Sequence, residues 1–361
     1  MAVTMPKIEI TFQQLAASFI RRSERGIAVL ILRDDTQGSG RNFFRYGDAT
    51  QVPEDEFTAA NRQYIKDALS FGPLRVSVVK VGTEGTLAQA LAILVQKEQT
   101  GWITVCGGTT QDWSDLSSWI KAREKEQKSW KAVCYNAAAP DCMHIVSLVN
   151  PKVTFADGRG QVEGSQYTPS LTGILAACNV LRGATGYVCG NLATVEEPED
   201  LDGAVGAGKF VLVNEDDQVK VGVDVNSMTT VNGSTQTEDM KYIETVEAMD
   251  LMRDDISSTF RKDYRGMYKN TTANQMLFLA AVNGYFRDLG DENVLDPTYD
   301  NAAGVDVASQ RNAWIDSGKA EAAGWDEGKV ISTPYKRKVF LGGDVKILGS
   351  MTDLRFVVTL M

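Results

Sequence analysis

The hydrophobic pattern of the chain begins with short apolar runs that alternate with amphipathic segments. Residues 26–32 are continuously apolar, which is typical of a strand buried on both faces of a parallel sheet. Further strands are expected at 74–81, 102–106, 131–135 and 145–149. Helical periodicity falls between the strands at 53–71, at 86–96, around 113–120 and from Thr168 to about 181. This alternation predicts an α/β body with a largely parallel sheet.

The pattern changes after the acidic loop at 196–200. A hairpin is expected from 209–213 and 219–221, and helices are expected over about 240–260 and 272–289. Trp314 and Trp325 flank a shorter helix, and residues 328–347 alternate as two strands around Gly342 and Gly343. We therefore expect four regions, which are an N-terminal arm over 1–25, an α/β body over 26–230, an α+β C-terminal domain over 231–349 and a C-terminal arm over 350–361.

Both ends of the chain carry a segment of alternating apolar and polar residues. One face of each segment is apolar, and the residues on these two faces are Ile8, Ile10 and Phe12, and Leu354, Phe356, Val358 and Leu360. A terminal strand of this kind has to pair with a sheet, because a free apolar edge invites association. It either completes the sheet of its own domain or is donated to another copy of the chain, and the pattern alone leaves both readings open.

Composition excludes several classes of function. The chain has 361 residues and a net charge of −10, which argues against broad contact with nucleic acid. No apolar run of about 18 residues is present, so we expect no membrane insertion, and no signal peptide is visible. The five cysteines have no C-x-x-C spacing and are expected to be buried thiols. His144 is the only histidine, and we expect it to pack in the core rather than to serve catalysis or a zinc site.

Glycine-rich segments offer the remaining candidates for a ligand site. The segment from Gly203 to Lys209 fits G-x-x-x-x-G-K, but Phe210 replaces the Ser or Thr that holds magnesium, and the expected strand–loop–helix context is missing. Two glycine pairs, Gly82 with Gly85 and Gly107 with Gly108, follow strands, where α/β enzymes bind small ligands. They are more often plain turns. We predict no catalytic, cofactor-binding or metal-binding residues, and an α/β enzyme with a ligand at these glycines is the alternative.

Ordered blocks of sequence resemble the contractile tail sheath proteins of myovirus-type phages, defective phages and R-type bacteriocins. The first block is AGKFVLV at 207–213, followed by NSMTT at 226–230. The blocks that follow are AMD at 248–250, DDI at 254–256, TF at 259–260, YRG at 264–266, Asn270, GYF at 284–286 and Leu289. The resemblance spans nearly the whole chain.

The resemblance implies a structural protein and not an enzyme. Sheath subunits of this family form stacked hexameric rings around an inner tube, and they contract to drive the tube through a target cell envelope. Their terminal arms add strands to the C-terminal domains of neighbouring subunits. For this chain, the resemblance implies production in the bacterial cytoplasm, incorporation into a phage tail or tail-like particle, and no cofactor. The implied partners are other copies of the chain, the inner tail tube protein, and the baseplate and tail-terminator proteins. A homo-oligomeric scaffold unrelated to tails is a further reading.

Overall fold

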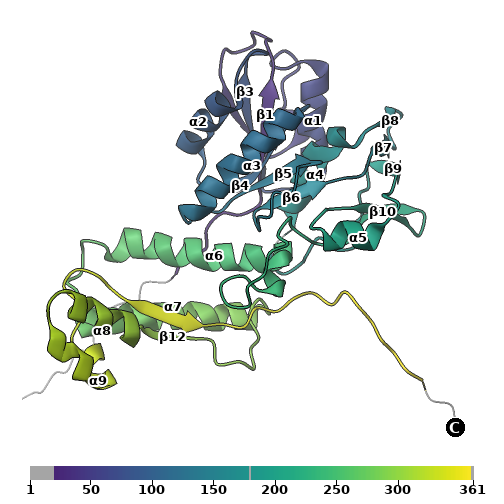
Figure 1. The fold of residues 1–361 in the computed structure, drawn as a ribbon. Coiled ribbons are helices and arrows are strands. Elements are labelled where there is room, and N and C mark those ends of the chain that lie inside the picture. The colour runs from purple at the N-terminus through teal and green to yellow at the C-terminus, as the bar shows by residue number, and fades with distance from the viewer. Residues whose placement is uncertain (1–19, 179, 359–361) are drawn as a thin grey trace, which may run out of the picture. The chain divides into compact units, whose positions relative to one another are not determined.

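The computed structural model describes residues 20–178 and 180–358, and Figure 1 shows their helices and strands. The chain divides into two compact units. The first, the body unit, contains Ser23–Met252 with residues 348–358, and the second, the C-terminal unit, contains Arg253–Ile347 with residues 20–22.

A six-stranded sheet in the order β2-β3-β1-β4-β5-β6 forms the centre of the body unit. Its strands are β1 (Ile27–Arg33), β2 (Phe43–Tyr46), β3 (Arg75–Val81), β4 (Gly101–Val105), β5 (Trp130–Tyr135) and β6 (Ile145–Leu148). Every neighbouring pair is parallel except β2 with β3. The prediction of a largely parallel sheet is therefore confirmed, and the antiparallel edge strand β2 is an addition that the sequence pattern did not indicate.

Helices cover both faces of this sheet. They are α1 (Ala59–Leu69) and α4 (Thr168–Ala177) on one face, and α2 (Leu87–Lys97) and α3 (Thr110–Lys125) on the other. Strand β1 serves both cores, because Ala28 and Leu30 pack with the first pair of helices whereas Val29 and Ile31 pack with the second. This two-sided burial explains why residues 27–32 of the strand are all apolar.

Side-chain caps fix where most of these helices begin. Helix α1 starts after Thr58, whose side chain accepts a hydrogen bond from the Asn61 amide, and not at residue 53 as predicted. Thr86 and Thr109 form capping boxes at the starts of α2 and α3. Helix α4 begins at Thr168 itself and ends at Ala177, earlier than the sequence indicated.

Two small antiparallel sheets complete the body unit. One has the order β8-β7-β9 and was not predicted; its strands are β7 (Lys152–Phe155), β8 (Gly160–Glu163) and β9 (Leu192–Val195). The other is the predicted hairpin of β10 (Leu212–Glu215) and β11 (Gln218–Val221). Asp216 and Asp217 have φ angles of 51° and 57°, the positive values that a two-residue hairpin turn requires. The short helix α5 (Leu201–Gly206) occupies the glycine-rich segment before Lys209, so no phosphate loop forms there.

The C-terminal unit is mostly helical. Its helices are the last part of α6 (Ile243–Thr259), the π-helix Phe260–Tyr264, α7 (Thr272–Asp291), α8 (Val307–Asp316) and α9 (Glu327–Ile331). Helices α6 and α7 confirm the prediction. A short 3₁₀ helix at Ala320–Gly324 lies between Trp314 and Trp325, where a short helix was expected. Helix α8, which contains Trp314, was not predicted.

The expected strand pair around Gly342 and Gly343 is wrong. Residues 327–331 form α9, and both glycines lie inside the single strand β13 (Leu341–Asp344). The partner of β13 is β12 (Ala302–Val305), a strand that was not predicted. Within residues 20–178 and 180–358, no helix has the length and apolar character needed to cross a membrane.

Candidate assembly site

Residues 351–358 are exposed and belong to the predicted C-terminal arm over 350–361. Figure 1 draws this segment without a strand arrow. On the predicted apolar face, the exposed fractions are 89% for Leu354, 79% for Phe356 and 67% for Val358. Large apolar side chains that gather on an exposed segment mark a surface for association.

Ser350 fixes the base of this arm to helix α6. Its backbone N–H donates to Glu244 Oε1 at 2.8 Å, and its hydroxyl donates to Glu244 Oε2 at 2.6 Å. A second carboxylate lies beside this contact, because a Cβ atom on Gly183 would lie 2.8 Å from Glu244 Oε2 and 2.9 Å from Asp224 Oδ2. Burial, with added repulsion from Glu244, raises the pKa of Asp224 to about 7.

The sheet of the C-terminal unit is suited to receive an added strand. Strands β12 and β13 pair only with each other among the described residues. A two-stranded sheet has little stability of its own and gains from a third strand. The strands are rich in small residues, and a Cβ atom on Gly343 would lie 2.8 Å from the Ala302 carbonyl oxygen. Glycine therefore lets the two strands approach closely.

Hydrogen bonds show which edge of this sheet is covered. The Asn283 side chain donates to the Ala303 carbonyl at 3.1 Å and accepts from the Ala303 N–H at 2.7 Å. The N–H and C=O of one residue in an antiparallel strand point to the same side. Asn283 thus covers the outer edge of β12 at Ala303, so an added strand would have to pair with β13 instead.

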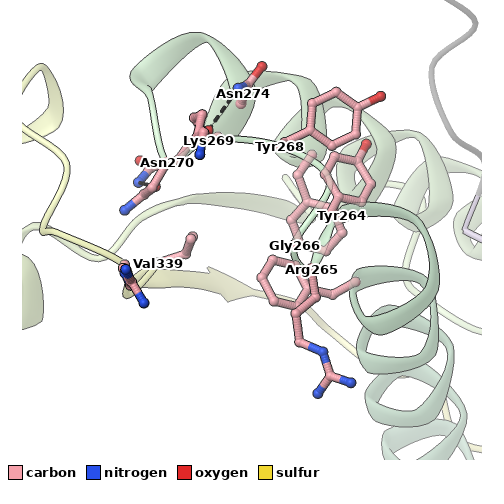
Figure 2. Close-up of a pocket in the computed structure, with 12 residues that line it drawn as sticks. Tyr264, Arg265, Gly266, Tyr268, Lys269, Asn270, Asn274 and Val339 are labelled. Atoms are coloured by element: carbon pink, nitrogen blue, oxygen red, sulfur yellow. Dashed lines mark hydrogen bonds between the residues drawn. The ribbon is translucent and has the colours of Figure 1, made fainter.

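A pocket of about 250 Å³ lies elsewhere in the C-terminal unit, as Figure 2 shows. Its aromatic wall includes Tyr264 and Phe278, whose ring centroids are 4.7 Å apart. The charged residues that line it are all basic, namely Arg265, Lys269 and Arg337. Such a lining favours a partner that carries carboxylates beside aromatic or apolar groups.

Side-chain amides fix the shape of this pocket. Asn270 donates to the Lys338 carbonyl at 2.9 Å, and Gln275 donates to Asn270 Oδ1 at 2.8 Å. Asn274 donates to the Lys269 carbonyl at 2.8 Å, as the dashed line in Figure 2 marks. The pocket is therefore preformed.

The glycines at which the alternative enzyme reading places a ligand make contacts within the fold. The Arg33 guanidinium donates to the Gly85 carbonyl at 3.1 Å and forms a bidentate pair with Asp112, with distances of 3.0 and 2.6 Å. A Cβ atom on Gly108 would lie 2.8 Å from the Trp113 ring. Side chains of the chain itself thus occupy the strand ends where a ligand of an α/β enzyme would bind.

The structure describes only some of the residues predicted for the arms. Ile8, Ile10, Phe12 and Leu360 lie outside the described residues. His144 is fully buried, as predicted. Sequence reasoning missed the Ser350–Glu244 contact and the pocket. The only signal for them was the basic run at 336–338 together with the aromatic residues around 264–268.

Comparison with known proteins shows a similarity to tail sheath proteins. The family description "Phage tail sheath C-terminal domain" matches residues 235–333. The tail sheath protein of Clostridium phage phiCD119 is 25% identical over 367 residues, an alignment that covers 96% of this chain and 97% of that protein. The chain is therefore similar to contractile tail sheath proteins over nearly its whole length.

Solved structures of sheath proteins share the fold. A sheath tail protein from Desulfitobacterium hafniense superposes with a TM-score of 0.68 at 16% identity, covering 83% of this chain and 94% of that one. The helical sheath of the anti-feeding prophage, solved in its contracted state, gives a TM-score of 0.71 at 11% identity and covers 99% of both chains. Tail sheath proteins are a structural, non-enzymatic family, and this chain is similar to one of them over nearly its whole length.

Proposed function

We propose that this protein is a tail sheath subunit, which polymerises as stacked hexameric rings around an inner tube and contracts to drive the tube through a target cell envelope. The similarity to a tail sheath protein and the likeness to a sheath solved in a contracted state support this proposal. The protein would be made in the bacterial cytoplasm and become part of a phage tail or tail-like particle. Its partners would be other copies of itself, the tube protein, and the baseplate and tail-terminator proteins.

Strand addition between neighbours is the central step of the proposed mechanism. The observation that carries it is the exposed arm, whose alternating face of Leu354, Phe356 and Val358 is largely accessible to solvent. This arm would pair with the edge of β13 in another copy. The N-terminal arm, with Ile8, Ile10 and Phe12, would add a strand in the same manner.

The strand pairs would remain intact while the subunits move. Main-chain hydrogen bonds of an added strand do not depend on how the bodies of the subunits pack. The bodies could therefore change from an extended to a contracted arrangement while the arms hold neighbours together. The energy would come from a metastable assembly, so the mechanism needs no nucleotide.

The two domains would have different positions in the sheath. We place the C-terminal domain, 231–349, on the inside against the tube and the α/β body, 26–230, on the outside. The arms have to lie near the domain that they augment, which supports this order. The basic pocket at Arg265, Lys269 and Arg337 fits the proposal, because it provides a preformed surface for acidic groups of a partner.

Removal of the arm tests the proposal. A chain truncated after residue 353 should fold as an unassembled subunit, because the removed residues that the structure describes are exposed. It should fail to form tubes or ring stacks in negative-stain electron microscopy, whereas the full chain should form them. Sheaths of normal length from the truncated chain would contradict strand donation, and compact particles from the full chain would contradict the sheath function itself.

Charge reversal on helix α3 tests the position of the body. Lys121 and Lys125 are exposed, so their replacement by glutamate should leave the fold intact. If this surface forms contacts on contraction, the double variant should assemble normally but lose stability in the contracted state. Equal loss of assembly and of contracted-state stability would argue against an outer, contraction-specific contact.

A further inference from the structure

Three side chains of different chemistry converge on one point in the body unit. Glu124 lies near the end of α3, and Cys142 and His144 lie in the segment that leads into β6. Cys142 Sγ is 3.1 Å from Glu124 Oε2, and His144 Nδ1 is 2.6 Å from the same oxygen. One potential ligand atom from each residue lies within 4.8 Å of the other two.

Asp250 and Lys131 hold the His144 ring in its orientation. The second ring nitrogen of His144, Nε2, lies 3.1 Å from Asp250 Oδ1, and Asp250 Oδ2 lies 2.8 Å from Lys131 Nζ. A carboxylate that accepts from one ring nitrogen fixes the tautomer and leaves the other nitrogen to bind a metal. His144 and Cys142 are buried, whereas the Glu124 side chain is 30% exposed and is free to adjust.

We propose that Glu124, Cys142 and His144 bind a divalent transition-metal ion of the zinc class. Thiolate sulfur, imidazole nitrogen and carboxylate oxygen are the ligands that Zn²⁺ takes in proteins. In a tetrahedral site, bonds of about 2.0–2.3 Å place neighbouring ligand atoms roughly 3.3–3.7 Å apart. The distances from Glu124 Oε2 to Cys142 Sγ and His144 Nδ1, 3.1 and 2.6 Å, are shorter than this. Glu124 would move outward slightly to make room, and water would complete a four-coordinate site.

Binding would exchange protons for the metal ion. The Cys142 thiol donates toward the Glu124 oxygen. The 2.6 Å contact between that oxygen and His144 Nδ1 also requires a proton between them, because two acceptors would repel each other at this distance. A divalent ion that replaces both protons leaves the net charge of the buried group unchanged. The ion would tie the end of α3 to the entry of β6 and, through Asp250, to the first part of α6.

The sequence did not indicate this site, because its only histidine is near just one cysteine. Glu124 precedes His144 by 20 residues and Asp250 follows it by 106. Only the fold brings these carboxylates to the ring. The pattern C-x-H at 142–144 was the one local signal.

Cobalt substitution of the full chain tests the proposal. Protein stripped with a chelator should bind one equivalent of Co²⁺ and show both the near-ultraviolet band of a thiolate–cobalt bond and the visible bands of four-coordinate cobalt. Zn²⁺ should displace the cobalt, and calorimetry in two buffers should detect proton release. Absence of a thiolate band in the wild-type protein would overturn the proposal.

Variants assign the ligands. Cys142→Ser should abolish the thiolate band and weaken Zn²⁺ binding at least tenfold, whereas Cys178→Ser, a change of another free cysteine, should alter neither. Asp250→Asn should keep the band and weaken binding about 10- to 100-fold, as loss of an outer partner does. If Cys142→Ser does not fold, Glu124→Gln replaces it, since that side chain is partly exposed. An unchanged spectrum and affinity in the folded ligand variant would refute the assignment.

Discussion

Replacing Val358 by alanine should weaken sheath assembly, whereas the same change at Val357 should have a much smaller effect. The two valines are adjacent and similarly exposed, at 67% and 72%. They point to opposite faces of an extended strand. Only Val358 shares a face with Leu354 and Phe356, the face that we expect to be buried against the receiving subunit.

The expected effect follows from the area that remains to be buried. Truncation of valine to alanine removes two methyl-sized groups, worth about 0.8 kcal/mol each on full burial. Scaling by the 67% of Val358 that is exposed gives about 1 kcal/mol per arm. This corresponds to a critical concentration for assembly that is about sixfold higher.

Sedimentation of the assembled fraction across a concentration series measures this value, and electron microscopy confirms that the pellet contains sheaths. The Val357→Ala variant is the matched control, because it loses the same strand propensity and the same volume. Equal effects of the two changes, or a larger effect at Val357, would refute burial of the Leu354 face.

Two further predictions concern the stability of the unassembled chain. Asp224→Asn should stabilise the protein above pH 7. Because the pKa of Asp224 is raised in the folded state, the wild-type protein loses stability as pH rises from about 4 to about 7. The difference between the folded and unfolded pKa, about three units, sets an upper limit of ~4 kcal/mol on this loss. Gly173→Ala should cost roughly 1–3 kcal/mol or more, because its Cβ atom would lie 2.3 Å from the Ala68 carbonyl oxygen and force α4 away from α1.

Urea denaturation measures both effects. For Asp224, curves at several pH values should show a steeper fall in the unfolding free energy for the wild-type chain than for the variant, and parallel pH profiles would contradict the account. For Gly173, the control is Gly206→Ala, whose Cβ atom would meet nothing within 4 Å. A similar loss in both glycine variants would mean that the contact of α4 with α1 is not the cause.

The sequence predicted the body unit best where burial is two-sided. Strands β1 and β3 are almost fully buried, so their apolar runs were clear. Strands β7 and β9 alternate over only four residues each and contain Lys152 or Thr194, so the signal is too short to separate from a loop. Strand β2 is similarly brief.

The clearest error of the sequence-based prediction is the turn expected at two glycines. Gly342 and Gly343 suggested a turn, but both lie within β13, and at Gly343 close packing against Ala302 and Ala303 explains the glycine. Sequence alone does not distinguish a glycine that supplies a turn from one that admits a neighbouring backbone. The candidate site shows the same limit: alternation revealed the apolar face of the arm, but the attachment of Ser350 to Glu244 depends on residues 106 positions apart.

The attachment at Ser350 gives the arm a defined reach. Residues 351–358 can span at most roughly 28 Å when fully extended. If a neighbour binds the far end of this segment, its distance from Glu244 is limited by the length of the segment. Inserting residues into segment 351–358 would let linked subunits move farther apart. Shortening the segment would limit how far a ring can rotate or slide before the added strands separate from their partners.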